Sequence, residues 1–341
     1  MASPSRLSMK NVAERRAVTR AVIEPILTAK RDEKLAGDYK RMAPDPNGFV
    51  HTLLLPNTAS FRLSSGGSLV FPNSTNMQNL AKKVAKYDKL YRIRDIVRAD
   101  PGMTLVCVDY KGAEALLVGA YSQDWGYVDK LLAGADTHRE LASLFFDKAQ
   151  ADVSEVERAI AKTLTYASFY MASVPTLTIH MNKDAHRTGV TLTQREVEQY
   201  RGIILQEHPL EAWWERTKRE LARTGGILRN ALGYRRIFHA PDEHKRCKDG
   251  LSFYPQSTVA CLMNEAWSEI ADRVVLIGNR ELRHQIHDEI MMQARPDEVP
   301  DLVRTVRPLL ERTFTVHERS IYIPTEWKVG EVWGTMEAYH E

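Results

Sequence analysis

The sequence predicts an α/β fold built on antiparallel strands, with helices inserted between them. The run TLVCVDY at 104–110 is short, apolar and ends on an acid, which is the pattern of a buried strand. The segments RHQI and EIMMQ flank His287 and Asp288, a pattern typical of a tight β-hairpin with an acid at its turn. Several longer segments repeat apolar residues at helical spacing, so helices are expected as well.

The composition is that of an ordinary globular protein. The 341 residues are 43% apolar and 27% charged, enough for a sizeable core and two or three subdomains. No apolar run approaches the length of a transmembrane helix, and the basic N-terminus lacks the apolar core of a signal peptide. Cys107, Cys247 and Cys261 are scattered, which indicates a reducing interior without a disulfide framework. We therefore expect a protein of the cytoplasm.

The net charge of +3 is small, but the cations are clustered. The stretch 82–98 holds Lys82, Lys83, Lys86, Lys89, Arg92, Arg94 and Arg98. The stretch 229–248 holds Arg229, Arg235, Arg236, Lys245, Arg246 and Lys248. Clustered cations can neutralise the phosphates of a nucleic acid, although a solvated basic face would have the same composition.

In chain order, residues 10–43 are expected to form the first helix. Their apolar residues fall roughly on one stripe, namely Val12, Val18, Val22, Ile26 and Leu27. A turn at 44–48 precedes a strand, FVHTLLL (49–55), and a loop rich in Ser, Gly and Asn (64–79). After strand 104–110, GAEALLVGAY (112–121) is predicted to turn helical.

The clearest helix covers residues 154–171, where Ser154 and Glu157 have the spacing of a capping box. One side gathers Val156, Ile160, Leu164, Ala167 and Met171. The other side carries residues at steps of four, namely Arg158, Lys162, Tyr166 and Tyr170. Two further helices are expected at 211–224 and 256–275.

Two acids stand where strands end, Asp109 at the end of strand 104–110 and Asp288 at the hairpin tip. A lone acid in such a place is more often a helix cap or a surface residue. If the strands are neighbours, however, the carboxylates converge, and two cations bridged by them could clamp the attacking and leaving oxygens of a phosphoryl transfer. Mg²⁺ suits such a site, because it binds a few carboxylates together with substrate phosphates.

The stripe on helix 154–171 carries the complementary charge. Arg158 and Lys162 project from its first turns, near the positive end of the helix dipole, where they could bind a polyphosphate. Tyr166, one turn further on, offers a face on which a base or sugar could stack. Without the two acids, a solvated helix face with one aromatic residue would be the simpler interpretation.

Eight collinear segments resemble family A DNA polymerases of the bacterial DNA polymerase I type. They are FRLSS (61–65), NMQN (76–79), VDYKGAEALL (108–117), DTHRELA (136–142), RAIAKTLTYASFY (158–170), LGYRR (232–236), QSTVA (256–260) and QIHDE (285–289). QIHDE, for example, is similar to the family's QVHDE, and the segment at 158–170 to its RxxAKxxxFGxxYG helix. The resemblance runs from about Arg62 to the C-terminus, and eight segments in order make a chance match negligible.

The resemblance implies a template-directed DNA polymerase that adds deoxynucleotides to a primer 3′-hydroxyl and releases pyrophosphate. Its partners would be primer-template DNA and deoxynucleoside triphosphates, and its cofactors two Mg²⁺ ions, for which Mn²⁺ can substitute. The implied fold is the right-hand α/β (α+β) polymerase fold, with an antiparallel palm sheet at 50–112 and 250–341. Helical fingers would lie at 113–249, and the N-terminal segment 1–49 would be a thumb remnant.

The resemblance also implies roles at the reaction centre. Asp109 and Asp288 would hold the two metals, with the carbonyl of Tyr110 as a further ligand. Glu114 would crowd a ribose 2′-hydroxyl and pair with Tyr170. The triphosphate would be held by three residues, Arg158, Lys162 and His138. Lys162 could also act as general acid for pyrophosphate, and Tyr166 would lie against the incoming sugar.

On the DNA side, Arg62 and Gln256 would read the minor groove near the primer terminus. His287 and Glu289 would support that terminus and the metal site, with Glu289 counted among the catalytic residues. The segment LGYRR adds Arg235 and Arg236 as DNA-binding residues.

Several positions depart from the family pattern, which puts fidelity, rate and fingers motion in doubt. Leu116 replaces an Arg in the first catalytic motif, and Lys111 and Gly112 replace Ser and Gln. Met171 replaces the Gly that follows the helix tyrosine, and Ser252 stands near a usual Asn.

Only 60 residues precede Phe61, and they hold no acidic cluster of the DxE type. We therefore expect no proofreading activity, a reduced or absent thumb, and low processivity that salt weakens further. A processivity factor or a separately encoded thumb could compensate. A compact, diverged polymerase suggests a bacterial or phage-infected host cytoplasm.

Two other interpretations stay open. A single-subunit RNA polymerase shares the two acids and the lysine-tyrosine helix, although Glu114 would exclude ribonucleotides and those enzymes lack an acid at the place of Glu289. A degenerate polymerase kept for DNA binding is the second, against which the intact acids and cations stand.

Overall fold

The computed structural model describes most of the chain after its N-terminal segment. The described residues are 44–67, 74–80, 84–86, 89–91, 93–183, 185, 189–274 and 280–340. The helix expected at 10–43 therefore lies outside them. The chain divides into two compact units, one made of Met1–Leu55 with Ser64–Leu80 and the other of Pro56–Leu63 with Ala81–Glu341.

The first unit contains a short antiparallel pair, β1 (Leu53–Leu55) and β2 (Ser64–Gly66), followed by the 3₁₀ turn η2 (Met77–Asn79). The strand predicted at 49–55 is thus confirmed only in its last three residues, and the loop predicted at 64–79 is wrong where β2 forms. Ser65 explains the second error, because its hydroxyl contacts Thr52 Oγ1 at 2.5 Å and accepts the backbone N–H of Met77 at 2.9 Å. Hydrogen bonds of side-chain hydroxyls stabilise this strand, whereas the sequence pattern used to predict strands depends on apolar residues.

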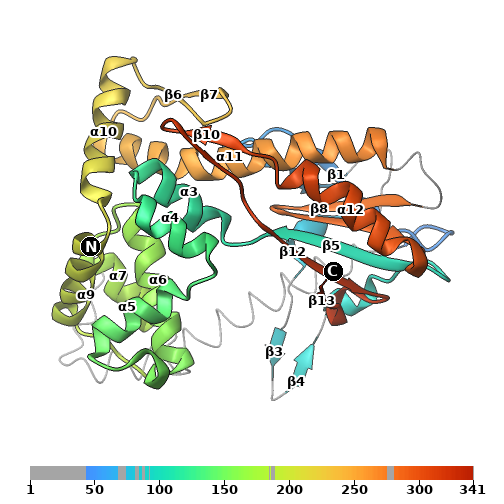
Figure 1. Ribbon diagram of the computed structural model, residues 1–341, viewed down its shortest axis with the longest axis horizontal. Coiled ribbons are helices and arrows are strands. Elements are labelled where there is room, and N and C mark those ends of the chain that lie inside the picture. The colour runs from blue at the N-terminus through green and yellow to red at the C-terminus, as the bar shows by residue number, and fades with distance from the viewer. Residues whose placement is uncertain are drawn as a thin grey trace, which may run out of the picture. The chain divides into compact units, whose positions relative to one another are not determined.

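The second unit is built on a five-stranded antiparallel sheet of order β13-β12-β5-β9-β8 (Figure 1). Its strands are β5 (Thr104–Tyr110), β8 (Glu281–Ile286), β9 (Glu289–Ala294), β12 (Thr325–Gly330) and β13 (Glu337–Tyr339). The predicted strand 104–110 and the hairpin around His287 and Asp288 are both confirmed. The central strand is β5, and both of its neighbours run antiparallel to it.

Both faces of β5 are buried, as the uninterrupted apolar run predicts. Val106 and Val108 join the main core with Leu302 and Val306 of α12 (Val299–Leu310). Tyr110 reaches the same helix, where its hydroxyl donates to the carbonyl of Leu310 at 3.0 Å. The strand is therefore fixed on this side by α12, and Asp109, the next residue back, points to the other face.

In the sequence, a helical region is inserted between β5 and β8, and Figure 1 shows it to one side of the sheet. Its helices are α3 (Ala113–Ser122), α4 (Trp125–Leu132), α5 (Thr137–Phe146), α6 (Glu155–Phe169), α7 (Val174–Asn182), α9 (Gln194–Glu207) and α10 (Leu210–Arg223). A hairpin of β6 (Ile227–Arg229) and β7 (Arg235–Ile237) follows. The helices predicted at 112–121, 154–171 and 211–224 are confirmed, each within two residues at its ends.

The helix predicted at 256–275 is part of a longer one, α11 (Glu243–Arg273). The prediction began too late because Pro255 lies inside the helix, and a proline lacks the N–H of an i to i−4 bond. α11 runs through the expected boundary between fingers and palm at residue 249, so that division of the chain stays a prediction.

The remaining elements are short. They are β3 (Val84–Lys86), β4 (Lys89–Tyr91), η3 (Ile93–Ile96), η4 (Gln150–Asp152), η5 (Pro296–Glu298), β10 (Phe314–Val316), β11 (Arg319–Ile321) and η6 (Trp333–Thr335). Within the described part of the chain, no helix is long and apolar enough to cross a membrane.

α6 begins and ends with recognisable caps. Ser154 and Glu157 form the predicted capping box. At the other end, Ala172 N–H donates to Ala167 O and Met171 N–H to Ser168 O, each at 3.2 Å, which is the Schellman pattern. Met171 occupies its left-handed position with φ = 57°, the position where the resemblance implies a Gly. A side chain in this conformation costs about 1–2 kcal/mol, so Met171 is strained.

We predict that Met171→Gly is more stable than Met171→Ala by about 1 kcal/mol. Both variants lose the methionine side chain, but only alanine keeps the strained Cβ. The comparison is made by urea unfolding. Ala159 on the exposed side of the same helix is the control, because Ala159→Gly should instead lose about 1 kcal/mol. An alanine variant at 171 as stable as the glycine variant would show that no strain is stored there.

Candidate active site

The pairing of β5 with β9 brings the two predicted metal-binding acids together. Asp109 lies directly opposite Glu289 in the ladder, and the N–H of Tyr110 donates to the carbonyl of Asp288 at 3.4 Å. Asp288 follows His287 in a two-residue turn, and His287 adopts φ = 58° there. Asp109 and Asp288 are both half-buried. The strands are therefore neighbours, as the prediction required, and their backbones place Asp109 and Asp288 at the same end of the sheet.

Glu289 is buried beside these acids and is held by two side chains. Arg94 Nη1 lies 3.9 Å from Glu289 Oε1, and the indole N–H of Trp333 donates to the same oxygen at 3.3 Å. The Arg94 guanidinium also stacks over the Trp333 ring, 3.9 Å from its centroid. Burial lowers the pKa of Arg94, while the negative charges of Glu289 and Asp109 oppose that shift. Arg94 therefore supplies positive charge to the acidic end of the sheet.

The cations predicted on α6 meet the start of α5. Arg158 Nε donates to Asp136 Oδ2 at 2.7 Å, and Asp136 also caps α5 by accepting the N–H of Arg139. Lys162 is exposed, with its ammonium 6.0 Å from the centroid of the Tyr166 ring. The Arg158 guanidinium is thus engaged with a carboxylate, while Lys162 is open to solvent.

His138 lies in the first turn of α5 and faces the same stripe, with its ring centroid 5.6 Å from that of Tyr166. Burial, followed by the positive charges of Lys162 and Arg158, lowers the pKa of His138 to about 4. The imidazole is therefore neutral at pH 7. A polyphosphate bound here would raise its pKa, because a nearby negative charge favours the imidazolium.

Tyr170 connects α6 to the segment that follows β5. Its hydroxyl donates to Glu114 Oε1 at 2.5 Å, the pairing that the resemblance implies. Glu114 lies in the first turn of α3, which begins three residues after β5 ends. Tyr166 is half-buried nearby, and burial followed by the charge of Glu114 raises its pKa to about 12. One hydrogen bond thus ties the cation-bearing helix to the strand that carries Asp109.

The donor set fits Mg²⁺ in number and chemistry. Asp109 and Asp288 offer hard carboxylate oxygens, and among the described residues no group of three or more His, Cys, Asp or Glu side chains is arranged to hold a metal ion. An ion that takes one or two carboxylates and completes its shell with water and phosphate oxygens matches this arrangement.

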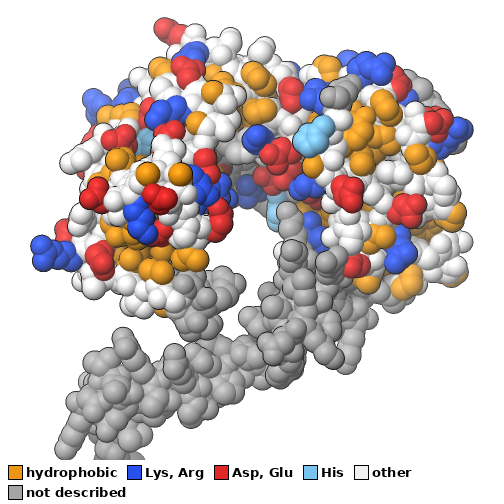
Figure 2. All heavy atoms as spheres, turned by 60° about the horizontal axis from the view of Figure 1, so that its bottom comes forward, with side chains coloured by type: hydrophobic (Ala, Val, Ile, Leu, Met, Phe, Trp, Pro, Cys, Tyr) orange, Lys and Arg blue, Asp and Glu red, His pale blue; other side chains and the backbone are white. Residues whose placement is uncertain are grey.

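Arg62, one of the predicted DNA-binding residues, lies near the hairpin turn. Burial lowers the pKa of His287, and the positive charge of Arg62 is the next largest cause. Arg62 also interacts with Tyr170. Burial raises the pKa of Tyr170, and the positive charge of Arg62 opposes this rise. Gln256 is half-buried on α11. On the face drawn in Figure 2, acidic, basic and histidine side chains gather around a central recess.

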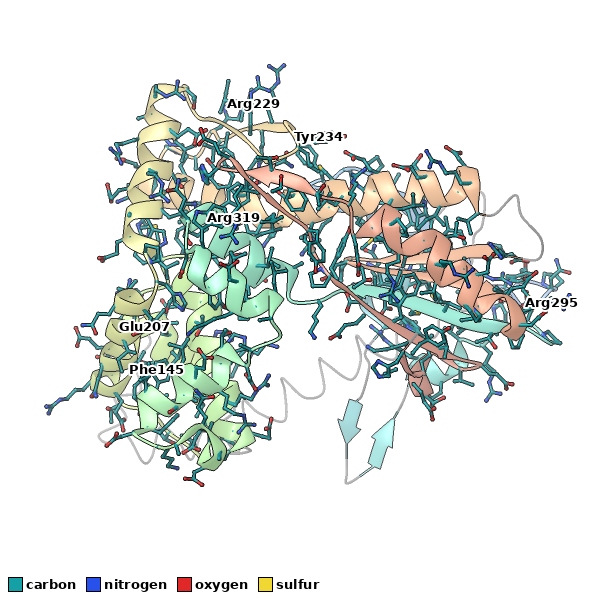
Figure 3. The ribbon with its side chains drawn as sticks, in the orientation of Figure 1. Phe145, Glu207, Arg229, Tyr234, Arg295 and Arg319 are labelled. Atoms are coloured by element: carbon teal, nitrogen blue, oxygen red, sulfur yellow. The ribbon has the colours of Figure 1, made fainter. Side chains whose placement is uncertain are left out.

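The basic stretches behave differently from each other. In the second stretch, Arg229 and Arg235 are exposed, and Figure 3 shows Arg229 pointing away from the protein. Arg236 is half-buried over the ring of Phe238, 4.5 Å from its centroid. In the first stretch, Arg94 is buried against Glu289, so its charge is engaged inside the protein. The side chains of residues 82–92 lie outside the described ones.

The departures from the family pattern have different settings. Leu116 is 1% exposed in the core of α3, where an arginine would be a buried charge. Lys111 lies at the surface, 3.8 Å from Glu326. Gly112 adopts φ = 60°, a left-handed turn between β5 and α3 that suits glycine. Ser252 is half-buried and its hydroxyl donates to the carbonyl of Asp249 within α11.

Sequence reasoning missed Arg94, Trp333 and Asp136 as parts of this site. Arg94 was hidden among the other cations of its stretch, and nothing near it in sequence marks its acidic partner. Asp136 carried a usable signal, because it precedes His138 within DTHRELA and has the residue type of an N-cap.

We predict that Arg94→Met lowers the free energy of unfolding by about 3 kcal/mol, because it leaves a buried carboxylate without its cation. Glu289→Gln should recover part of this loss in the Arg94→Met background, although it destabilises the protein with Arg94 present. Urea unfolding of the two single variants and the double variant gives the coupling. Purely additive effects would show that Arg94 and Glu289 do not interact.

Comparisons with known proteins agree with this geometry. DNA polymerase I of Pseudomonas aeruginosa is 25% identical over 323 residues, which is 90% of this chain and 33% of that protein. DNA polymerase I of Chloroflexus aurantiacus is 26% identical over 326 residues, covering 91% and 32%. The DNA polymerase of Bacillus phage SP01 is 23% identical over 308 residues, covering 85% and 29%. The chain thus spans about a third of the length of these relatives.

The fold has a solved counterpart. The POL domain of Pol1 from M. smegmatis, in complex with DNA primer-template and dNTP, matches 98% of this chain and 58% of its own, with a TM-score of 0.72 and 19% identity. The family model for DNA polymerase family A matches residues 5–335. The expected α/β palm-and-fingers fold is confirmed, and this chain belongs to DNA polymerase family A.

Proposed function

We propose that the chain is a DNA-directed DNA polymerase that extends a primer 3′-hydroxyl by two-metal phosphoryl transfer. The observation that carries the proposal is the Glu114–Tyr170 hydrogen bond. It ties a helix bearing Arg158 and Lys162 to the first turn of α3, which closely follows the strand that carries Asp109. A triphosphate lying on the helix would thereby have its α-phosphate toward the acids. The substrates would be primer-template DNA and deoxynucleoside triphosphates.

Asp109 and Asp288, with the carbonyl of Tyr110, would hold two Mg²⁺ ions. Those ions would activate the primer hydroxyl and neutralise charge on the triphosphate. Arg158 would exchange Asp136 for a phosphate oxygen, and Lys162 would bind the leaving pyrophosphate and could donate its proton. His138 is neutral at pH 7 and would donate a hydrogen bond to the phosphates.

On the sugar side, Glu114 would crowd the 2′-carbon of the incoming nucleotide, held in place by Tyr170. Tyr166 has its ring beside that of His138 and interacts electrostatically with Glu114. It would lie against the sugar. Arg62 and Gln256 would contact the minor groove at the primer terminus, beside His287. Arg235, exposed, and Arg236 would contact DNA outside the reaction centre. Low processivity and the absence of proofreading stay predictions.

Asp109→Asn and Asp288→Asn should each reduce the rate of nucleotide incorporation about a thousandfold or more, because metal binding supplies several kcal/mol of transition-state stabilisation. The matched control is Asp129→Asn, which removes an exposed carboxylate paired with Arg319 and should leave the rate unchanged. Rapid-quench primer extension with Mg²⁺ measures all three. Full activity in either active-site variant would overturn the metal assignment.

Glu114→Ala should weaken discrimination against ribonucleotides by about 10–100-fold, since it opens space beside the 2′-carbon and leaves Tyr170 without its partner. The same assay on the wild type tests the alternative of an RNA polymerase, because such an enzyme would prefer ribonucleotides without any substitution. A template-bound but inactive protein would indicate the DNA-binding relative instead.

Tyr166→Phe should raise discrimination against dideoxynucleotides about tenfold, because the tyrosine hydroxyl can supply the contact that a missing 3′-hydroxyl no longer makes. Tyr200→Phe, which changes a tyrosine stacked on Phe145, is the matched control. Equal chain termination by the wild type and Tyr166→Phe would place the Tyr166 ring away from the sugar.

A further inference from the structure

The side-chain amide of Asn264, on α11, joins two parts of the site that are far apart in sequence. Its Nδ2 donates to the backbone carbonyl of Phe61 at 2.9 Å. Its Oδ1 accepts from Gln285 Nε2 at 3.1 Å. Phe61 is the residue before Arg62, and Gln285 lies in the hairpin that carries Asp288. Both ends of one amide are therefore used, each toward a different segment of the site.

The Gln285 end of this bridge is fixed in the sheet. Gln285 is 1% exposed and lies in β8 opposite Ile290 of β9. The next pair in the ladder is Ile286 with Glu289, directly before the turn at Asp288. The ladder fixes Gln285 relative to Asp288 and Glu289. The hydrogen bond from Gln285 therefore fixes the Asn264 amide relative to these two acids.

The Phe61 end is a backbone that needs support. Phe61 adopts φ = 61°, which costs a residue other than glycine about 1–2 kcal/mol and persists only where the surroundings hold it. Its ring packs against Phe253 of α11 and Tyr234 of the β6–β7 hairpin, with centroids 6.0 and 5.8 Å apart. Tyr234, labelled in Figure 3, is tied in turn to α11 by a 3.0 Å hydrogen bond to Glu265.

Asn264 therefore acts on the orientation of the peptide group between Phe61 and Arg62. The rings hold the Phe61 side chain, and Thr58 Oγ1 donates to the carbonyl of Arg62 at 2.6 Å. The carbonyl of Phe61 lies between these anchors, and the Asn264 amide donates to it. Rotation of that peptide would redirect the Arg62 side chain, which leaves the chain at the next Cα.

We propose that Asn264 is a positioning residue. It fixes the segment that holds Phe61 and Arg62 relative to the β8–β9 hairpin, whose turn carries Asp288. Recognition of a purine or pyrimidine acceptor in the minor groove of the primer terminus is thereby coupled to alignment of the reacting 3′-hydroxyl. The inference rests on the proposed polymerase function and on the proposed contact of Arg62 with the minor groove.

The test uses Asn264→Asp, which is close to isosteric. The carboxylate still accepts from Gln285 but has no N–H for the Phe61 carbonyl. Asn182→Asp is the matched control, because the Asn182 amide likewise donates to a backbone carbonyl, that of Leu192 at 2.8 Å, within the helical region. If Asn264→Asp fails to fold by circular dichroism, Asn264→Ser, which is too short to reach Phe61, takes its place.

The measurement is single-turnover incorporation of the next correct deoxynucleotide on two primers. One primer ends in guanine and the other in 3-deazaguanine, which lacks the minor-groove N3 acceptor. The wild type should lose about tenfold on the second primer, the worth of a charge-assisted hydrogen bond. Asn264→Asp should lose about tenfold on the guanine primer, with nucleotide affinity within about twofold of wild type, and its 3-deazaguanine penalty should fall below about threefold.

The outcomes separate the two levels of the argument. An Asn264→Asp enzyme that keeps the full 3-deazaguanine penalty, or an Asn182→Asp enzyme that loses it equally, overturns the positioning role while the polymerase proposal stands. A wild type that extends both primers equally removes the Arg62 contact and this inference with it. A wild type that extends neither primer overturns the proposed function itself.

Discussion

The antiparallel pairing of β5 with β9 is the constraint on which the rest of the site depends. A register shift of one residue would turn every side chain of a strand to the other face of the sheet. Asp109 would then enter the apolar core beside α12, and Val108 would take its place beside Glu289. The register is fixed on the face of β5 that packs against α12, by the buried Tyr110–Leu310 hydrogen bond and by the apolar residues Val106 and Val108. The packing of β5 against α12 therefore decides which face of the sheet carries Asp109 and Glu289.

Charge in the site is balanced by exchangeable partners. Glu289 is held by Arg94 and Trp333, which leaves it little freedom, whereas Arg158 is held by Asp136 in a half-exposed contact. Half-exposed ion pairs are worth little, typically below about 1 kcal/mol, because solvent screens them. A triphosphate with several negative charges would compete for Arg158 at small cost, while the buried Arg94 pair would stay intact. The difference in burial thus separates a structural ion pair from one that a ligand can replace.

Local patterns were predictable from the sequence, and long-range contacts were not. The capping box at Ser154, strand 104–110 and the turn at His287 each depend on residues that are neighbours along the chain, and each is confirmed. Collinear motifs then supplied the family. Arg94 and Asn264 could not be found in this way, because their partners Glu289 and Phe61 come close only after the sheet and α11 have formed. The start of α11 was missed for a local reason, the proline at 255, whose cost the surrounding core outweighs.

The end of α6 brings local strain and the site together. Tyr170 is the C-cap residue of α6, and Met171 after it holds the left-handed conformation of the Schellman motif. The left-handed φ disfavours a methionine at this position, whereas the packing of its side chain against the core favours the observed conformation. Because the Tyr170 hydroxyl is bonded to Glu114, any change in how α6 ends must also move or break that hydrogen bond. The conformation at Met171 is therefore coupled to the position of Glu114, the acid that we propose faces the sugar, through the single hydrogen bond of Tyr170.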